Sequence, residues 1–204
     1  MRETAGALEA VGETAENVTL LFADIVGFTS YSSTRQPTEV VDMLSRLFTA
    51  FDQECSELNL YKVYTIGDCY VVMSFIDKND RKTPEQECIS VTELGFKMIE
   101  QIAKVRRELD FEGLHMRIGI HTGKIIGGVI GTGIIRYDLY GKDVLIANKM
   151  ESSGKQDAVH ISADTKKMLE NSLTTKYKYT KDEDVYIKAL QTSVKTYFIE
   201  KVQD

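Results

Sequence analysis

The stretch VTLLFADIVGFT, residues 18–29, places an apolar run, an aspartate and a glycine turn in immediate succession. The apolar run over 18–23 predicts a buried central strand that ends at Asp24. Gly27 predicts a tight turn into a helix, where backbone N–H groups can bind phosphate oxygens. Taken alone, this segment favours an ordinary strand-to-helix turn. Together with Asp24, it predicts adjacent metal and phosphate sites.

A second aspartate, Asp68, follows Gly67 between two strand-like segments, 61–66 and 69–75, which predict a hairpin. If this hairpin lies beside the strand that ends at Asp24, the two carboxylates meet at one sheet edge. Their repulsion would raise each pKa unless a cation lies between them. Such oxygen ligands suit Mg²⁺ or Mn²⁺. In the alternative interpretation, Asp24 caps the next helix and Asp68 only forms a turn.

The rest of the chain alternates strand and helix patterns around this centre. Apolar residues at helical spacing predict helices that start at Pro37 and Ala163 and helices over 89–109 and 143–152. Short strand patterns occur over 116–121, 124–130, 134–140 and 158–161, near 177 and 186, and over 196–201. These patterns predict a mixed α+β fold with one central sheet. Residues 1–16 have weak periodicity and are predicted to be a flexible lead-in, which leaves 17–204 as one domain.

Composition narrows the class of protein. The chain has 204 residues, 43% of them hydrophobic, which suffices for a buried core. The excess of 31 acidic over 25 basic residues argues against a nucleic-acid partner. Three cysteines without a CxxC motif indicate reduced thiols in a cytosolic setting. No apolar run reaches the roughly 18 residues of a membrane span. We therefore expect a cytoplasmic domain, cut from a membrane-anchored protein and attached to the membrane only through the rest of that polypeptide.

Several ordered motifs resemble the class III adenylyl and guanylyl cyclase catalytic domain. They are FADIVGFT (22–29), YTIGDCY (64–70), MRIGIHTG (116–123), YDLYGKDV (137–144), NKME (148–151) and KTYF (195–198). The resemblance implies a ferredoxin-like βαββαβ core with extra C-terminal elements and a mainly antiparallel sheet. It also implies conversion of ATP or GTP to the 3′,5′-cyclic monophosphate and pyrophosphate.

The resemblance also assigns roles to individual residues. Asp24 and Asp68 match the aspartates that hold two Mg²⁺ or Mn²⁺ ions, and the backbone carbonyl of Ile25 matches a further metal contact. Arg117 matches an arginine that pairs with the triphosphate. The matching phosphate-binding turn consists of Ile25, Val26, Gly27, Phe28 and Thr29.

Other family positions are substituted. An active partner half offers an asparagine and an arginine where this chain has Leu145 and Lys149. Leucine cannot hydrogen-bond through its side chain, and lysine lacks the bidentate fork of arginine. The chain therefore resembles the metal-binding half of a heterodimer, which needs a complementary cyclase domain; alone it would be a weak homodimer.

The choice between ATP and GTP stays open. Tyr64 and Asp138 occupy the base-reading positions. Asp138 suits the adenine amino group, whereas Tyr64 matches neither an adenylyl nor a guanylyl pattern. In a heterodimer both residues would line a degenerate second pocket.

Two other functions compete with a cyclase. One is a dimerisation or nucleotide-sensing module of the same fold, which would have no need of paired carboxylates. The other is a palm-type polymerase or cyclic-dinucleotide synthase, whose acidic hairpin signature YTIGDCY does not match. The three histidines, at 115, 121 and 160, are predicted to be structural.

Overall fold

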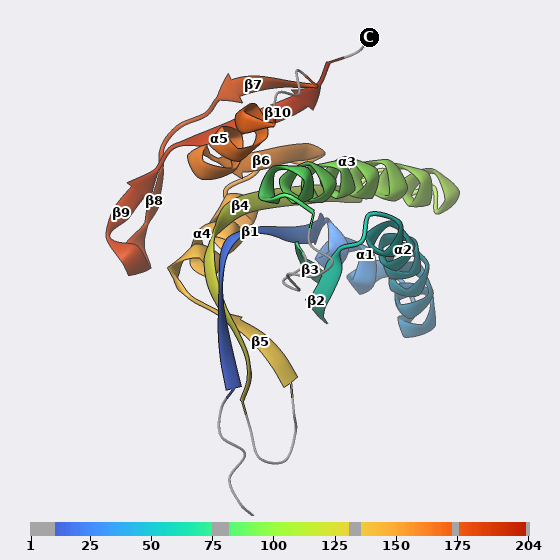
Figure 1. Ribbon diagram of the computed structural model, residues 1–204. Helices are drawn as coiled ribbons and strands as arrows, with labels where there is room; N and C mark the ends of the chain where they lie inside the picture. The colour runs from blue at the N-terminus through green and yellow to red at the C-terminus, as the bar shows by residue number, and fades with distance from the viewer. Residues whose placement is uncertain (1–10, 75–81, 131–135, 173–175, 203–204) are drawn as a thin grey trace, which may run out of the picture.

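The computed structural model describes residues 11–74, 82–130, 136–172 and 176–202 (Figure 1). Its strands are β1 (Val11–Val26), β2 (Tyr61–Ile66), β3 (Cys69–Met73), β4 (His115–Ile130), β5 (Arg136–Tyr140), β6 (Ala158–Ser162), β7 (Tyr177–Lys181), β8 (Val185–Ile187), β9 (Thr192–Val194) and β10 (Thr196–Lys201). Its α-helices are α1 (Phe28–Thr34), α2 (Pro37–Glu57), α3 (Pro84–Glu108), α4 (Lys142–Ser152) and α5 (Ala163–Asn171), and η1 (Lys188–Leu190) is a 3₁₀ helix.

The main sheet has the strand order β2-β3-β1-β4-β6-β10-β7, and β5 pairs with β4. Among the strand pairs of the described residues, only β4–β6 is parallel. The order β1-α2-β2-β3-α3-β4 contains the βαββαβ core, which confirms the expected fold class. Strands β8 and β9 form a separate two-stranded arm. The two long strands β1 and β4 lie at the centre of this sheet. They join the β2–β3 hairpin on one side to β6, β10 and β7 on the other.

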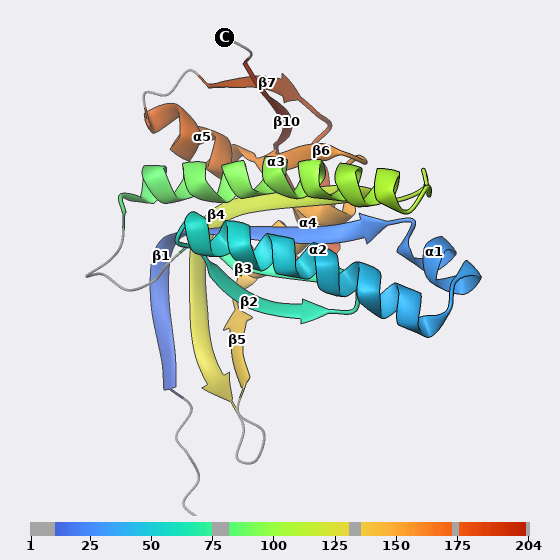
Figure 2. The same cartoon turned by 90° about the vertical axis from the view of Figure 1, so that its right-hand side faces the viewer.

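Helices cover both faces of the sheet. Helices α2 and α3 run side by side across one face (Figure 2). A Cβ on Gly95 of α3 would lie 3.1 Å from the side chain of Ile118 and 3.6 Å from that of Leu21. Helix α4 packs on the opposite face. There a Cβ on Gly119 would lie 1.9 Å from the backbone nitrogen of Glu151. The glycine therefore lets the end of α4 approach β4 closely.

The start of each long helix follows from its local sequence. Pro37 and Pro84 occupy first helical positions, where the missing N–H costs nothing. Thr83 caps α3 by accepting a hydrogen bond from the Gln86 backbone nitrogen at 3.3 Å. Buried apolar residues then recur along both helices, and α3 and the central strands enclose the core.

Several boundaries differ from the predictions. β1 begins at Val11, so the flexible lead-in predicted over 1–16 is wrong for 11–16; residues 1–10 lie outside the described residues. Residues 12–14 are exposed in an arm that β1 forms with β4, so the strand carries no apolar pattern there. β4 is one strand through Thr122 and Gly123, where the glycine-rich pattern predicted two. The short strand β9 was not predicted.

Two further observations concern the chain as a whole. None of the helices in the described ranges is both long and apolar enough to cross a membrane. Cys55, Cys69 and Cys88 are free thiols, as the sequence predicted.

The tight turn after β1 gives a stability test. Gly27 has φ +85°, and a Cβ there would lie 2.0 Å from the carbonyl oxygen of Gly113. Gly67 has φ +60° but no atom within 4 Å of the added Cβ. Gly27→Ala should lower the free energy of unfolding by about 3 kcal/mol, because backbone strain and overpacking add. Gly67→Ala should cost about 1 kcal/mol, since only the left-handed backbone is penalised.

Urea unfolding of both variants measures the difference. Equal losses would show that the contact between Gly27 and Gly113 does not restrict this turn.

Candidate active site

The pairing of β1 with β3 brings Asp24 and Asp68 to the same sheet edge. Ala23 pairs with Tyr70, so the next residue of β1, Asp24, lies opposite Cys69. Cys69 directly follows the turn that holds Asp68. Burial raises the pKa of Asp68, and the charge of Asp24 raises it further. Helix α1 has Gly27 as its N-cap and no side-chain cap hydrogen bond, so Asp24 does not cap it. Asp68 does lie in a turn, as the alternative interpretation of this residue also predicted.

Arg117 lies on the other side of Asp24, because Asp24 and Arg117 are cross-strand partners in the β1–β4 pair. Its Nη2 donates to Asp24 Oδ2 at 3.0 Å, and its Nε donates to Glu151 Oε1 at 2.5 Å. The side chains of Asp24 and Arg117 are 26% and 28% exposed, respectively, so the pair remains accessible. In this structure the guanidinium therefore bridges two carboxylates from different elements.

Glu151 was not among the predicted site residues. It lies at the end of α4 and is buried, with its side chain 8% exposed. Burial raises the pKa of Glu151; Arg117 opposes this shift, and Asp24 and Asp68 add to it. The one sequence feature that could have indicated Glu151 was Gly119, since a glycine within a strand often marks the close approach of another backbone segment. Here that segment is the end of α4 at Glu151.

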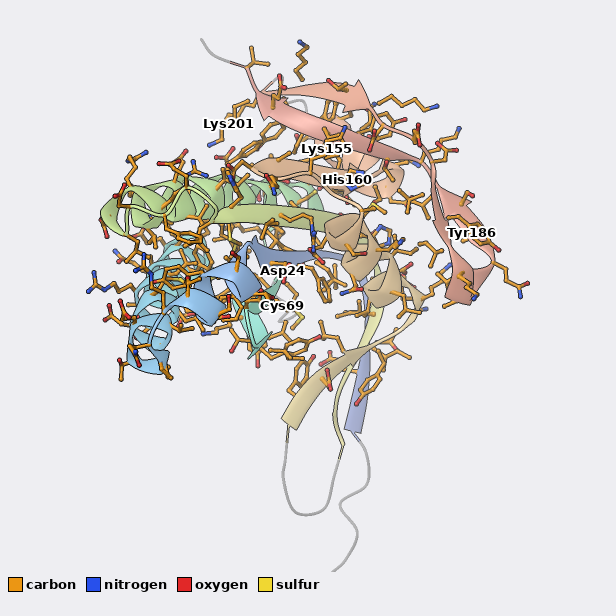
Figure 3. All side chains as sticks on the ribbon, turned by 180° about the vertical axis from the view of Figure 1, so that it is seen from behind. Asp24, Cys69, Lys155, His160, Tyr186 and Lys201 are labelled. Carbon is orange, nitrogen blue, oxygen red and sulfur yellow. The ribbon has the colours of Figure 1, made fainter. Side chains whose placement is uncertain are left out.

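The acidic edge also determines the state of the neighbouring thiol. Figure 3 labels Asp24 and Cys69 close together, on the paired strands β1 and β3. Burial raises the pKa of Cys69 to about 12, and the charges of Asp24, Glu151 and Asp68 contribute. The thiol is therefore neutral at pH 7.

The donor set fits a divalent cation. Within the part of the chain that the structure describes, no group of three or more His, Cys, Asp or Glu side chains is arranged as a metal site. Asp24 and Asp68 nevertheless supply two carboxylates whose repulsion a cation would relieve. With Glu151 they place three negative charges around the single positive charge of Arg117. Oxygen donors and an uncompensated negative charge suit Mg²⁺ or Mn²⁺.

The glycine turn lies directly after Asp24. Gly27 begins α1, and the first intrahelical bond runs from the Tyr31 nitrogen to the Gly27 carbonyl at 2.9 Å. The first turn carries no acidic residue. Thr29 is exposed, whereas Ile25 is buried and Val26 and Phe28 are half-buried. The amides of this turn are therefore not capped by a side chain.

The two positions to which the resemblance assigns base reading lie on strands that approach each other. The rings of Tyr61 in β2 and Tyr137 in β5 meet edge to face at 5.9 Å. Tyr64 packs against the apolar cluster that includes Leu139. The Asp138 carboxylate accepts a hydrogen bond from the Leu139 backbone nitrogen at 3.0 Å.

The substituted positions lie on α4. Leu145 is 46% exposed, and Lys149 is half-buried one turn later. They are spaced by four residues and so share a face of the helix, whereas Glu151 projects from a different face.

The histidines make structural contacts. His115 Nδ1 lies 2.6 Å from Asp157, His121 Nδ1 lies 2.7 Å from Ser162 Oγ, and His160 Nδ1 lies 2.8 Å from the Met150 carbonyl.

A cavity of about 570 Å³ lies apart from the two aspartates, where α3, α4 and α5 begin. Lysines and carboxylates line it together, so their charges largely offset one another. It therefore shows no clear preference for an anion or a cation.

Comparison with known proteins agrees with this geometry. Residues 11–201 match the family model described as the adenylate and guanylate cyclase catalytic domain. The chain therefore belongs to this family of nucleotide cyclase domains.

Individual relatives are much longer than this chain. A guanylate cyclase of Toxoplasma gondii is 41% identical over 192 residues, which cover 93% of this chain and 4% of that protein. The guanylate cyclase soluble subunit alpha-1 of Canis lupus familiaris is 39% identical over 155 residues, 76% of this chain and 22% of that protein. The crystal structure of the guanylate cyclase domain of RhGC from Catenaria anguillulae, in complex with GTP, superposes with a TM-score of 0.79 at 26% identity. That match covers 94% of this chain and 100% of the solved one.

The coupling between the two aspartates can be measured directly. In an Asp24→Asn variant, the pKa of Asp68 should fall, because the charge of Asp24 raises it in the wild-type chain. The pKa should not return fully to that of a free aspartate, since burial remains. Carboxyl ¹³C NMR titration of both proteins tests this.

Asp42→Asn, which removes an exposed carboxylate of α2, is the control. An unchanged Asp68 pKa in Asp24→Asn would show that the two carboxylates do not interact.

Proposed function

We propose that this chain is the metal-binding half of a purine nucleotide cyclase, which converts GTP or ATP to the 3′,5′-cyclic monophosphate and pyrophosphate. The observation that carries the proposal is the charge arrangement at the end of β1. Arg117 bonds to Asp24 and Glu151, and the charge of Asp24 acts on Asp68 beside it. A glycine turn without a side-chain cap follows Asp24 directly. A cation and a phosphate group could therefore bind side by side.

Each residue of this half has a distinct role in the proposal. Asp24, Asp68 and the carbonyl of Ile25 would hold two divalent ions. Bound there, the ions would lower the pKa of the ribose 3′-hydroxyl and offset charge on the triphosphate. The amides of the turn from Ile25 to Thr29 would bind phosphate oxygens. Arg117 would pair with the triphosphate through its planar guanidinium.

The complementary half of the site would come from a partner domain. Leu145 and Lys149 cannot replace the asparagine and arginine that orient the ribose and stabilise the transition state. Exposed apolar side chains near this half support a protein partner, among them Ile66, Ile126 and Tyr140. A heterodimer is also supported by the similarity to a protein named as a cyclase subunit. Without such a partner, the chain would form a homodimer of weak activity.

GTP is the favoured substrate. Both relatives compared above are named guanylate cyclases. Asp138 would suit adenine, but in a heterodimer Tyr64 and Asp138 would line the second, degenerate pocket. The partner would then read the base.

The whole protein would be larger than the chain, because the chain covers only 4% of its Toxoplasma relative. We propose a cytoplasmic location, with a membrane anchor elsewhere in the polypeptide. A module that only dimerises or senses nucleotide is the second candidate function. It is supported by Leu145 and Lys149, which replace the two residues that would stabilise the transition state.

A gain-of-function experiment tests the half-site. The wild-type chain with Mn²⁺ and GTP should form little cyclic GMP. The double variant Leu145→Asn/Lys149→Arg should be faster by on the order of 10²-fold, because it restores two transition-state donors. Cyclic GMP and cyclic AMP are measured from GTP and ATP in parallel, which also tests the choice of base.

A complementing chain provides the matched control. Asp24→Asn/Asp68→Asn/Leu145→Asn/Lys149→Arg should be inactive alone, yet active when mixed with the wild-type chain. Nucleotide binding without turnover in every combination would instead support the sensing module.

A further inference from the structure

Arg117 holds two carboxylates that differ in accessibility. Its Nη edge contacts Asp24 at 3.0 Å, and its Nε contacts Glu151 at 2.5 Å. Asp24 lies at the exposed sheet edge beside Asp68. Glu151 is buried against β4, where the glycine at position 119 admits the end of α4.

The two contacts should therefore differ in how easily they exchange. A buried carboxylate that loses its arginine leaves an uncompensated charge, which costs far more than losing an exposed pair. The contact with Glu151 is thus the anchor. Asp24 is accessible and can exchange Arg117 for another positive charge, such as a divalent cation.

We propose that Arg117 is an exchangeable counter-ion for Asp24 and that Glu151 is the positioning residue that keeps it in the site. When a divalent cation binds Asp24, Arg117 releases this carboxylate while its Nε stays on Glu151. The freed Nη edge would then be available to a phosphate oxygen. This inference rests on the proposed function for the phosphate ligand, but the exchange at Asp24 does not need it.

The exchange predicts opposite effects of one substitution on two ligands. Arg117→Gln should bind Mn²⁺ alone about tenfold more tightly, because it removes the competing charge at Asp24. With Mn²⁺ saturating, the same variant should bind inorganic tripolyphosphate about tenfold more weakly, since a charge-assisted hydrogen bond is lost. Electron paramagnetic resonance measures free Mn²⁺, and calorimetry measures tripolyphosphate binding.

The matched control is Arg106→Gln. Arg106 also pairs with a carboxylate near the start of β4, at 3.2 Å from Asp157, but among the residues that the structure describes it forms no ion pair with Asp24. Both affinities should stay within twofold of the wild type in this variant. A similar gain in Mn²⁺ affinity there would overturn the exchange, because it would reflect general electrostatics.

The role of Glu151 is tested by a double-mutant cycle. Glu151→Gln removes the charge that holds Nε; with Mn²⁺ saturating, it should weaken tripolyphosphate binding about tenfold, because Arg117 then loses its charged anchor. In an Arg117→Gln background, the same change should alter that affinity less than twofold. Equal losses in both backgrounds would show that Glu151 does not act through Arg117 and would overturn the positioning role.

Two outcomes separate this inference from the proposed function. If the wild-type chain does not bind tripolyphosphate with Mn²⁺, the proposed function is contradicted, and the Mn²⁺ measurement alone decides the exchange. The Arg117→Gln variant could fail to fold because Glu151 is left unpaired. In that case the Arg117→Gln/Glu151→Gln double variant, which removes both charges, is measured in its place. Unchanged Mn²⁺ affinity in the folded variant would overturn the exchange.

Discussion

The pairing of β1 with β4 is the constraint on which the rest of the structure depends. The two strands are each 16 residues long and pair along nearly their whole length, with one irregularity between Ala15 and Val18. Beyond this irregularity the strands form part of the central sheet, and before it they form an arm. The same register sets Asp24 opposite Arg117. The strand pairing that builds the core therefore also places these two residues side by side.

The second constraint is the close packing of α4 on β4. A side chain on Gly119 would overlap the backbone at Glu151, so only glycine admits the helix end at this distance. Because α4 approaches here, Glu151 becomes buried and reaches Arg117. The carboxylates at this edge of the sheet repel one another, but Glu151 keeps the guanidinium of Arg117 beside them. A small residue in a strand thereby determines the electrostatics of a site two residues away.

Much of the fold could be predicted because its signals are local. The strand at 61–66 and the start of α2 at Pro37 follow from apolar pattern and turn residues, and their positions agree with the structure. The start of β1 could not be predicted, since an exposed arm needs no apolar alternation. Glu151 was missed for a different reason. A glutamate at a helix end is ordinarily solvated, and its contact with Arg117 is made across 34 positions of the chain.

Under the proposed function, the arrangement of α4 explains how one half of a site could be lost while the other persists. Glu151 projects toward Arg117, whereas Leu145 and Lys149 lie on another face of the same helix. Substitutions at 145 and 149 therefore leave the packing at Gly119 and the Arg117 contacts unchanged. In a symmetric dimer, each chain would need both faces of α4 to complete its sites. Once a partner supplies one face, only the other is constrained, and an exposed leucine costs the fold nothing.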